Sequence, residues 1–559
     1  MKKLLTVVLL LLSLTLTKAF AQINIVPQPA EIKMGNGDYI LTASTKIMYG
    51  ASAEKQAKYL QGFLKNNYGL SLALVLHNGK TCGSGATSIQ VFQKANSAAA
   101  DSYELSIASD KLSIEGNTAP GVFYAIQSLL QLLPATHHLA DKKITIPALV
   151  INDHPRFSYR GMHLDVGRHF FPADYIKKYI DYLAFNKFNY FHWHLTEDQG
   201  WRIEIKRYPR LTSVGGFRNG TIIGRYPGTG NDNQPDGGFY TQKEIKEIVT
   251  YAADRYVTII PEIELPGHGS AAIAAYPQLS CFPGQKTLIP ETMSSEASKK
   301  ATGKLVQETW GVFEDVFCPS EYTFTFLQNV IDEVLPLFPS KYIHIGGDEC
   351  PKEAWKKSAF CQQLIKDKNL KDEHGLQSYF IQRIEKYINS KGKKIIGWDE
   401  ILEGGLAPNA TVMSWRGEEG GIEAAKQGHD VIMTPGATCY FDHSQNKNED
   451  SITIGGYLPL QTVYGYEPIP AVLSVEQAKH VLGAQANVWT EYISNTAKLE
   501  YMIFPRMSAL AEVLWSPKEK RNYADFEKRL PAIVERYNFW GVNFSKAYLD
   551  GANTAAEKK

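Results

Sequence analysis

Carboxylic acids, histidines and tryptophans gather in short motifs at a few points of this 559-residue chain. The most informative is HIGGDE at 344–349, where an apolar run ends in two glycines followed by Asp348 and Glu349. Two carboxyl groups in different surroundings can divide acid–base work, as in the cleavage of a glycosidic bond. Neighbours on an extended strand point to opposite faces, however, so this pair is not expected to face each other as nucleophile and acid. One of the two therefore needs another task.

Comparable groups stand at or just past the ends of other apolar runs. They are Asp165, His194, Glu264, Asp399, Glu400, Arg416 and Glu491, together with Trp398, Trp415 and Trp489. Any single carboxylate could cap the helix that follows it, but capping does not account for the whole set. Carboxylates and arginine hydrogen-bond to hydroxyl groups, and the apolar face of a sugar ring stacks on tryptophan. The pattern predicts a carbohydrate site lined by carboxylates and walled by tryptophan.

The elements that must position these residues alternate along the chain. The eight apolar runs cover 159–166, 189–196, 258–264, 342–349, 393–400, 411–416, 429–435 and 481–489, and helical patterns include 172–186, 241–255, 320–335, 374–390 and 498–512. Eight strands alternating with helices predict an α/β fold, a (β/α)8 TIM barrel, whose strands all end at one mouth. The long segments 265–319 and 436–480 fit loops at that mouth.

The first part of the chain has a different pattern. Residues 103–107 and 111–115 alternate as two strands of a hairpin, and apolar residues recur at helical spacing over 120–133. We therefore expect a small α+β domain at 22–154 before the catalytic barrel, which with a C-terminal helical end would occupy 155–559.

Residues 1–21 are typical of a cleavable signal peptide. Lys2 and Lys3 precede an apolar run from Leu4 to Leu16, and Ala19-Phe20-Ala21 supplies the small-x-small pattern for cleavage after Ala21. The run is shorter than the ~20 residues that a membrane span needs. The sequence thus predicts a periplasmic or secreted protein with no membrane anchor after cleavage.

Composition narrows the choice of partners. The chain is 44% hydrophobic and 21% charged with a formal net charge of +1, which is ordinary globular composition and gives no bulk attraction to nucleic acid. Its six cysteines are too few and too scattered for a disulfide framework. Cys281 and Cys318 are the leading candidates for a pair that closes a loop, although spacing does not fix connectivity.

Taken in order, the motifs resemble those of glycoside hydrolase family 20, the β-N-acetylhexosaminidases. They run from about 159 to 515 and comprise Arg160-Gly-x-His163-x-Asp165, HWHLTEDQGWR (192–202), PEIELPGH (261–268), HIGGDE, GWDE (397–400), SWRG (414–417), Tyr440-x-Asp442 and Trp489-Thr-Glu491. The stretch GVFYAIQSLLQLL (121–133) is similar to the family's usual N-terminal domain.

The resemblance implies an exo-acting, retaining glycosidase that removes terminal non-reducing β-linked N-acetylhexosamine from glycans or chitooligosaccharides. Catalysis would be substrate-assisted, the family's exception to the rule of two facing carboxylates. The substrate's own 2-acetamido oxygen attacks the anomeric carbon, Asp348 orients the acetamido nitrogen, and Glu349 acts as general acid and then base. Glu349 would need a raised pKa. No metal and no organic cofactor is implied, and N-acetylglucosamine (GlcNAc) versus N-acetylgalactosamine (GalNAc) stays open.

The resemblance also assigns substrate-binding roles. Arg160 would hold ring hydroxyls, with an ion pair at the barrel floor as the alternative. Trp398, Trp415 and Trp489 would wall the acetamide pocket, Tyr440 would bind the acetamido oxygen, Asp442 would partner Asp348, and Glu491 would bind a ring hydroxyl. His268 would be linked to the acid/base through a carboxylate, for which Asp198 is preferred although the adjacent Glu197 is not excluded.

Two departures from the family pattern stand out. A further aromatic wall expected in the 440–465 loop is not a tryptophan here, so Tyr457 or Tyr464 would replace it. Ser358 takes the place of one cysteine found in relatives, which leaves Cys350 and Cys361 as a candidate pair.

Two rival functions have weaker support. His192-x-His194 puts two imidazoles on one strand face, as metal hydrolases do, but in amidohydrolase-type barrels that pair lies on the first strand. A non-catalytic sugar-binding protein would be expected to lack the acid/base, yet Glu349 is present. The motifs of serine hydrolases, P-loop proteins and HExxH metalloproteases are missing from the sequence.

Overall fold

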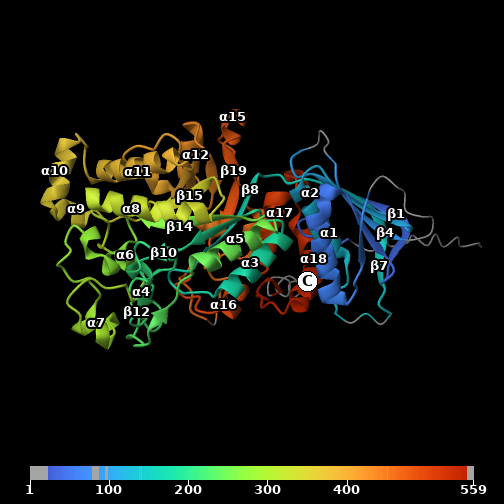
Figure 1. Cartoon of the computed structure of the whole chain (residues 1–559), viewed down its shortest axis with the longest axis horizontal. Coiled ribbons are helices and arrows are strands. Elements are labelled where there is room, and N and C mark those ends of the chain that lie inside the picture. The colour runs from blue at the N-terminus through green and yellow to red at the C-terminus, as the bar shows by residue number, and fades with distance from the viewer. Residues whose placement is uncertain are drawn as a thin grey trace, which may run out of the picture.

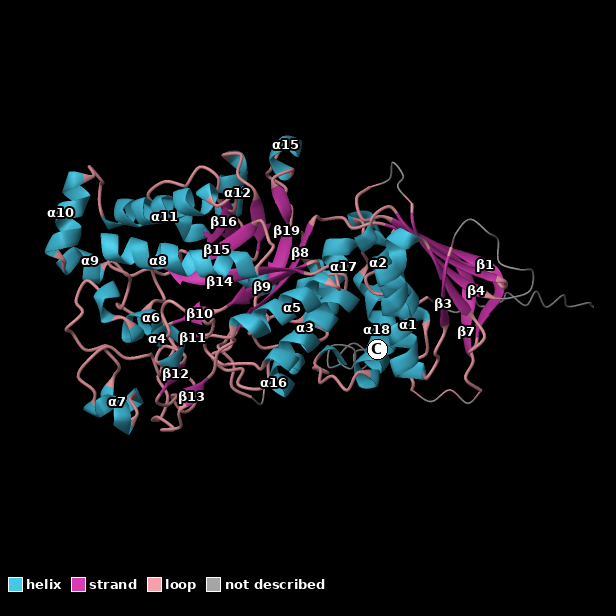
Figure 2. Ribbon diagram, viewed as in Figure 1, coloured by secondary structure: helices cyan, strands magenta, loops and turns pink. Residues whose placement is uncertain are grey.

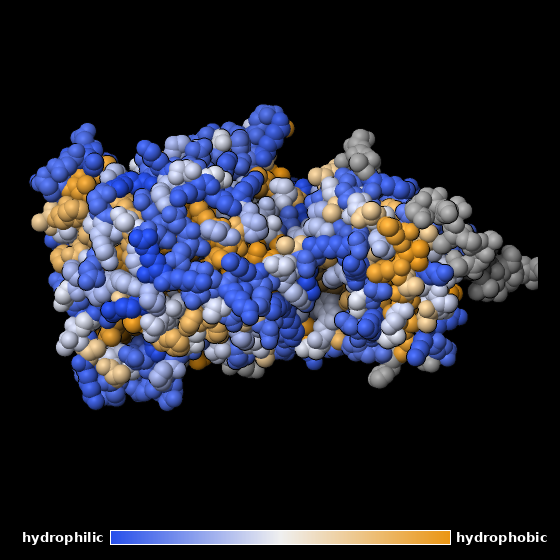
Figure 3. Space-filling view, in the orientation of Figure 1, coloured by the Kyte–Doolittle hydropathy of each residue, from blue (hydrophilic) through white to orange (hydrophobic). Residues whose placement is uncertain are grey.

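The computed structural model describes residues 23–77, 87–94, 99–137, 139, 141–449 and 451–549. The predicted signal peptide and Cys82 lie outside the described residues. Within the described part, no helix is long and apolar enough to cross a membrane. The face in Figure 3 is largely hydrophilic, with apolar residues in smaller patches between.

The N-terminal domain is a seven-stranded mixed sheet with helices packed between it and the barrel (Figure 1). Its strands are, in spatial order, β1 (Glu31–Leu41), β7 (Ile144–Asp153), β5 (Tyr103–Ile107), β6 (Lys111–Gly116), β4 (Ser88–Gln93), β2 (Lys46–Tyr49) and β3 (Ala73–Leu76). The predicted hairpin is β5–β6. The predicted helix is α2 (Ala119–Leu132), which is buried along most of its length beside α1 (Glu54–Tyr68).

Eight parallel strands close a barrel, which confirms the predicted fold class. They are β8 (Tyr159–Asp165), β9 (Tyr190–His194), β14 (Thr258–Leu265), β15 (Tyr342–Gly346), β16 (Lys394–Trp398), β17 (Thr411–Ser414), β18 (Val431–Met433) and β19 (Val481–Ala486). Each falls within or nearly within one of the eight predicted apolar runs. Strands buried on both faces read as continuous apolar runs, which is why the sequence located them.

Helices cover the outside of the barrel. Four predicted helices correspond to α3 (Ala173–Phe185), α5 (Gln242–Ala253), α8 (Glu321–Val334) and α11 (Glu373–Ser390). The single helix predicted over 498–512 is wrong, since the chain forms α16 (Thr496–Ile503) and α17 (Arg506–Trp515). Pro505 separates them because proline lacks the amide hydrogen that would continue the helix. The long α18 (Tyr523–Phe539) follows.

Several short elements lie in the loops that follow the barrel strands, and Figure 2 shows them gathered at one end of the barrel. They are β10 (Thr196–Glu197), β11 (Gly200–Trp201), β12 (Phe217–Arg218), β13 (Asp236–Gly237), α4 (Arg210–Ser213), α6 (Ser270–Ala275) and α7 (Glu296–Lys300). The carboxyl ends of the strands and these loops build the mouth where a barrel's active site lies.

The opposite end of the barrel rests on the N-terminal domain. Lys187, fully buried, bonds through Nζ to Asp153 Oδ2 (3.1 Å) and to the Tyr103 hydroxyl (2.9 Å). Trp515 Nε1 donates to the same Asp153 oxygen at 2.9 Å. A buried charge is tolerated only when it is paired and hydrogen-bonded, so this network fixes the contact between the two domains.

Candidate active site

A cavity of about 210 Å³ opens at the carboxyl ends of the barrel strands. This volume is below the roughly 300–1,000 Å³ typical of pockets for drug-sized ligands, and it suits a single sugar ring. Its lining comprises Arg168, His194, Glu197, Glu264, His268, Asp348, Glu349, Trp398, Trp415, Tyr440, Asp442, His443, Ile454, Trp489 and Glu491. Nine of the eleven predicted catalytic and binding residues line this cavity. The other two, Arg160 and Asp198, do not.

The Asp348–Glu349 pair is presented by an unusual backbone. After β15, Gly346 and Gly347 have φ of 64° and 92°. A Cβ atom on Gly346 would lie 1.8 Å from Glu264 Oε2, so only glycine fits. Glu349 itself has φ of 41° and His268 has 47°, a left-handed conformation that costs a non-glycine residue on the order of 1 kcal/mol. The turn leaves Asp348 buried and the Glu349 side chain 41% exposed at the cavity rim.

Behind the pair runs a chain of alternating carboxylates and imidazoles. Glu262 contacts His194 Nδ1, and His194 Nε2 lies 3.1 Å from Glu197 Oε2. Glu197 Oε1 is 2.9 Å from His268 Nδ1, whose ring places Nε2 3.6 Å from Glu349 Oε2 and 3.9 Å from Asp348 Oδ2. Charges of alternating sign stabilise one another in a buried chain. The chain therefore connects the barrel core to the catalytic pair.

The partner of His268 is not one carboxylate but two. Asp198 Oδ2 lies 3.1 Å from His268 Nδ1, close to the 2.9 Å separation from Glu197 Oε1. Asp198 also accepts the backbone N–H of Ser270 at 2.8 Å. Sequence did not decide between the two residues, and the structure brings both to the same nitrogen.

Two opposing effects set the charges of these carboxylates and imidazoles. Burial disfavours the charged forms, and pairing with a group of opposite charge favours them. Burial opposes a charge on His268, but Glu197, Asp198 and Glu349 outweigh it and raise the pKa of His268 well above its usual value. Burial likewise opposes a charge on His194, yet its pKa is raised to about 10, chiefly by Glu262. Both imidazoles are therefore cations at neutral pH.

The pKa values of Asp348 and Glu349 are shifted in directions that differ from the sequence expectation. The His268 imidazolium, whose Nε2 lies 3.6 Å from Glu349 Oε2, holds the pKa of Glu349 below its ordinary value. Burial raises the pKa of Asp348 to about 7, and the neighbouring Glu349 charge adds to the rise. The predicted upward shift of the Glu349 pKa is thus wrong, because its carboxylate is part exposed and faces a cation. Of the two carboxyl groups, Asp348 therefore holds a proton more readily than Glu349.

Four aromatic side chains form the cavity wall, and they are Trp398, Trp415, Tyr440 and Trp489. Trp415 and Tyr440 stack with ring centroids 6.1 Å apart, and Trp489 lies 5.7 Å from Trp398. Trp398 Nε1 donates to Glu262 Oε1 at 3.0 Å, and Trp415 Nε1 donates to Glu400 Oε2 at 2.9 Å. Because the indole N–H groups of Trp398 and Trp415 donate to carboxylates outside the cavity lining, these two rings present apolar surface to a ligand.

Several buried acceptors in the cavity have no donor. Within the described residues no hydrogen bond reaches Asp348 Oδ1, Asp442 Oδ1, Glu491 Oε2 or either oxygen of Glu264. Unsatisfied buried polar atoms are rare in native proteins. Burial raises the pKa values of Asp442 and Glu491 as well. Such a group of acceptors fits a ligand that carries several N–H and O–H donors.

The structure corrects the prediction for Arg160. Its side chain lies at the amino end of β8 and donates to the carbonyl oxygens of Lys187 (2.8 Å) and Phe157 (2.7 Å) and to the Tyr124 hydroxyl (3.0 Å). It is part of the contact with the N-terminal domain, at the end of the barrel away from the cavity. Strand direction explains the error, because Arg160 is the second residue of β8 and only the last residues of a strand reach the mouth.

Arg168 is the arginine that lines the cavity, and the sequence reading missed it. It follows Asp165, the last residue of β8, and its Nη2 lies 3.2 Å from Glu197 Oε2. Its guanidinium stands over the Trp489 ring at 5.1 Å from the centroid, and its Nε has no hydrogen-bond partner in the described part of the chain. The sequence did contain a signal for Arg168, because it lies just past the end of a predicted strand, where side chains reach the barrel mouth.

Neither tyrosine proposed for the further aromatic wall lines the cavity. Tyr464 is buried elsewhere, with its hydroxyl donating to Glu512 at 2.8 Å, and Tyr457 is exposed outside the cavity lining. Ile454 occupies that side instead. His443 of the same loop also lines the cavity, so this loop contributes an imidazole as well as an aliphatic side chain.

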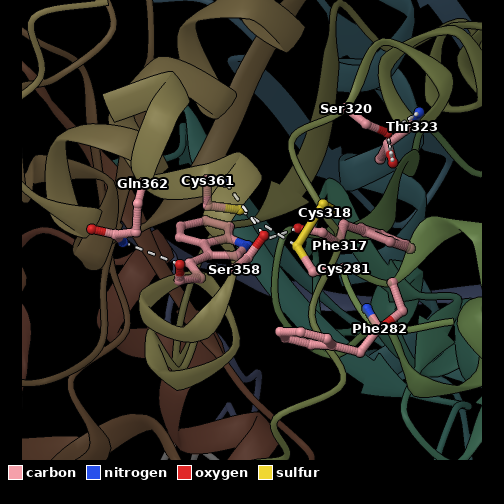
Figure 4. The surroundings of a disulfide bond; sticks show 11 residues. Cys281, Phe282, Phe317, Cys318, Ser320, Thr323, Ser358, Cys361 and Gln362 are labelled. Carbon is pink, nitrogen blue, oxygen red and sulfur yellow. Dashed lines mark hydrogen bonds between the residues drawn. A yellow bond between two sulfur atoms is a disulfide. The ribbon is translucent and has the colours of Figure 1, made fainter. Parts of the chain in front are cut away.

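A disulfide joins Cys281 and Cys318, as Figure 4 shows. Phe317 N donates to Pro266 O at 2.9 Å, which links the disulfide-bonded loop to the His268 turn. The candidate pair Cys350–Cys361 is wrong, since both are free buried thiols and Cys361 Sγ lies 3.4 Å from Cys281 Sγ.

Some buried groups could approach a metal ion. His163, His194 and Glu262, and likewise His192, Glu262 and His344, bring ligand-type atoms within 4.8 Å of one another. Glu262 already contacts His194 and lies 2.7 Å from His344 Nδ1 and 3.0 Å from Trp398 Nε1. The structure thus engages Glu262 in a hydrogen-bonded polar cluster below the cavity.

Comparison with known proteins follows the same division of the chain. Residues 157–518 match the family described as glycosyl hydrolase family 20, catalytic domain, and residues 22–154 match glycosyl hydrolase family 20, domain 2. A beta-hexosaminidase of Porphyromonas gingivalis is 46% identical over 529 residues, which cover 93% of this chain and 64% of that protein. The chain thus spans just under two thirds of that relative's length.

Solved structures agree with the sequence relatives. An exo beta-N-acetylglucosaminidase of Vibrio harveyi, crystallised with N-acetylglucosamine, has a TM-score of 0.80 and 32% identity and covers 94% of this chain and 79% of its own. A beta-N-acetylhexosaminidase of Bacteroides fragilis has a TM-score of 0.76 and 30% identity and covers 94% of this chain and 97% of its own. With a catalytic-domain match over more than half its length and a cavity built from the predicted motifs, this chain belongs to glycosyl hydrolase family 20.

Proposed function

We propose that the protein is an exo-acting β-N-acetylhexosaminidase that removes terminal non-reducing GlcNAc, with GalNAc as a second candidate sugar, from glycans or chitooligosaccharides. The observation that carries the proposal is the single-sugar cavity in which Asp348 and Glu349 stand beside an aromatic wall and unsatisfied acceptors. A cavity of about 210 Å³ has room for one terminal sugar residue, which favours exo action. Family relatives that act on or bind N-acetylated sugars support the assignment.

Binding would place the 2-acetamido group between the aromatic side chains and Asp348. The methyl group packs on the apolar faces of Trp398, Trp415 and Trp489, and the acetamido N–H donates to Asp348. Tyr440, which stacks on Trp415, supplies a hydroxyl for the acetamido oxygen. Ring hydroxyls of the sugar provide the donors that Glu491 and Asp442 lack.

The chemical step uses the substrate as its own nucleophile. The acetamido oxygen attacks the anomeric carbon as Glu349 gives a proton to the departing glycosidic oxygen, which leaves an oxazolinium-type intermediate. Water then attacks the same carbon while Glu349 takes its proton, so the anomeric configuration is retained. Holding the nucleophile within the substrate saves several kcal/mol of the entropy cost of bringing two molecules together.

Sugar binding also explains how Glu349 becomes an acid. Before sugar binds, Asp348 holds a proton more readily than Glu349, because the pKa of Asp348 is raised to about 7 while the pKa of Glu349 is lowered. An acetamido N–H favours the charged form of Asp348, and the sugar ring covers Glu349 and disfavours its charge. The proton therefore moves to Glu349 without a change in the total charge of the pair.

A chromogenic panel tests the function directly. Aryl β-glycosides of GlcNAc, GalNAc, glucose and galactose are compared under one set of conditions. We expect turnover of the N-acetylated sugars and loss of activity on glucose and galactose, because these lack the internal nucleophile. Equal rates on the glucose and GlcNAc substrates would rule out the acetamide mechanism.

The two arginines should respond differently to truncation. Arg168→Ala removes a charge-assisted contact to the sugar, worth about 1.5–3 kcal/mol, so kcat/KM should fall by about 10- to 100-fold. Arg160→Ala should lower the melting temperature and leave KM of the folded protein unchanged, since Arg160 bonds only within the domain contact. Steady-state kinetics with thermal unfolding of both variants checks this, and a raised KM for Arg160→Ala alone would reverse the assignment.

Removal of metals should leave activity intact. The mechanism uses a carboxyl pair and an internal nucleophile, so no step requires a Lewis acid. After dialysis against a chelator, kcat on the GlcNAc substrate should equal that of the untreated protein. A loss restored by one divalent ion would favour the metal-hydrolase alternative built on His192 and His194.

Export to the periplasm or the medium is part of the proposal. It is supported by the basic start, the apolar run and the Ala19-Phe20-Ala21 pattern. The mature protein should begin at Gln22 and fractionate outside the cytoplasm. N-terminal sequencing of the protein from each fraction tests both points, and a mature chain that starts at Met1 would contradict them.

A further inference from the structure

A second cavity, about 650 Å³ in volume, lies at the contact between the two domains. It is three times as large as the catalytic cavity, and none of its lining residues is shared with that cavity. Side chains from α1 and α2, from α3 of the barrel and from the end of α18 surround it, and Figure 1 shows these helices where the N-terminal domain adjoins the barrel. We call it the interdomain groove.

Aromatic side chains supply much of the lining of the interdomain groove. They are Tyr59, Phe63, Tyr182, Phe185, Phe539 and Trp540. Trp540 is part exposed and packs edge-on against Phe185, with ring centroids 4.2 Å apart. Tyr59 and Phe63 are also part exposed, one turn apart on α1. Rings of this kind offer the flat apolar surface on which sugar rings stack.

Polar groups stand among these rings. Asn66 is exposed on α1, and Asp181 is bound by Arg255 and accepts the Tyr251 hydroxyl at 2.7 Å. Gln127 is 1% exposed, and its Nε2 makes no hydrogen bond in the described part of the chain. Its amide lies near enough to the Tyr59 hydroxyl to lower that group's pKa against the larger effect of burial.

The unsatisfied amide is the observation that points to a ligand. A buried N–H without an acceptor costs about 1–3 kcal/mol, and a ligand oxygen in the groove would supply one. The ligand must also offer apolar faces to several rings and polar groups to the side-chain amides of Asn66 and Gln127. A pocket of this size accommodates more than one sugar ring, and it is too large for an ion.

We propose that the interdomain groove binds a segment of an N-acetylated saccharide chain, separately from the catalytic cavity. This inference rests on the proposed function, because the choice of saccharide follows from the substrate class assigned there. The groove would hold the enzyme on a glycan while terminal sugars enter the catalytic cavity of the same or another chain end.

Gly62 gives a clean test because it lines the groove from within α1. A Cβ atom at this position would meet nothing within 4 Å, and its φ is not in the left-handed range. A larger residue is therefore compatible with the helix and removes the cost of a mid-helix glycine. Gly62→Trp should fill the groove, and Gly62→Ala is the matched control that leaves it open.

Both variants are made in the full chain with Glu349→Gln, so that a β-1,4-linked GlcNAc hexamer is not consumed during calorimetric titration. We expect two hexamers per chain for Glu349→Gln alone and with Gly62→Ala, and one with Gly62→Trp. Excess GlcNAc monosaccharide should displace the hexamer from the catalytic cavity and leave the groove occupied. Gln127→Leu, which removes the donor, should weaken the groove site at least threefold.

Failure of this inference can be separated from failure of the proposed function. If Gly62→Trp binds the same number of hexamers as Gly62→Ala, the groove is not a saccharide site, whatever the catalytic activity. If the unmodified protein hydrolyses no N-acetylglucosaminide, the proposed function fails, yet a hexamer site lost in Gly62→Trp would still establish the groove. Melting temperatures of the Gly62 variants that are no lower than that of Glu349→Gln alone exclude misfolding as the cause.

Discussion

Glu349→Gln should lower kcat on GlcNAc glycosides with poor leaving groups by about 10²- to 10⁴-fold, the usual contribution of a general acid. Glutamine keeps the shape of the side chain but has no proton to give to the departing oxygen. Substrate should still bind with a similar KM, because the aromatic walls and Arg168 are unchanged. The loss should shrink for aryl groups that leave readily as anions, since these need little protonation.

The measurement is a comparison of kcat across a series of aryl leaving groups for Glu349→Gln and the unmodified protein. Glu353→Gln is the matched control, because Glu353 is an exposed carboxylate four residues away whose partner in the described residues is Lys356 at 3.3 Å. A loss that is equal for all leaving groups, or that also occurs in Glu353→Gln, would show that Glu349 is not the acid.

The barrel could be predicted because its strands leave a strong local signal. Each apolar run is buried on both faces and stops at polar residues, so strand positions and their carboxyl ends are legible without tertiary information. The same logic located most of the cavity. Trp398, for example, is the last residue of β16, and Asp348 lies two residues past Gly346, the last residue of β15.

The prediction for Arg160 is wrong because it follows the family motif and not the position of the residue along its strand. Arg160 lies five residues before Asp165, about 16 Å along a strand that rises roughly 3.3 Å per residue, and the distance alone separates it from the mouth. Arg168 lies just beyond the strand end. Strand direction, applied consistently, would have favoured Arg168 over Arg160.

Other features depend on contacts that no local pattern records. The lowered pKa of Glu349 comes from His268, which a different strand and its loop bring to 3.6 Å. The placement of Tyr464 depends on how the long loop after β18 folds back toward Glu512. His268 pairs with both Glu197 and Asp198 because a tight turn after β9 brings the two carboxylates to the same nitrogen. The sequence identified both residues as candidates but could not show that both would reach His268.

Asp348→Asn should be nearly as damaging as loss of the acid, and for a different reason. Asparagine can accept the acetamido N–H but carries no negative charge to stabilise the positive oxazolinium as it forms. Removing a charge or donor aimed at a transition state costs about 10²- to 10³-fold in kcat. KM should change little, because the apolar walls that hold the acetamide remain. Asp430→Asn is the control, since Asp430 is a part-exposed carboxylate just before β18 that pairs with His480 at 3.5 Å.

The pH profile makes this prediction specific to the catalytic pair. In the unmodified protein, kcat/KM should fall as the pH rises through about 7, because the pair then loses its one proton, which resides on Asp348 in the free enzyme. In Asp348→Asn, Glu349 is the only carboxyl group left of the pair, and His268 holds its pKa low. The alkaline limb should therefore move to lower pH. A merely structural role for Asp348 would lower activity at every pH and leave the limb in place, so kcat/KM measured between about pH 4 and 9 decides between them.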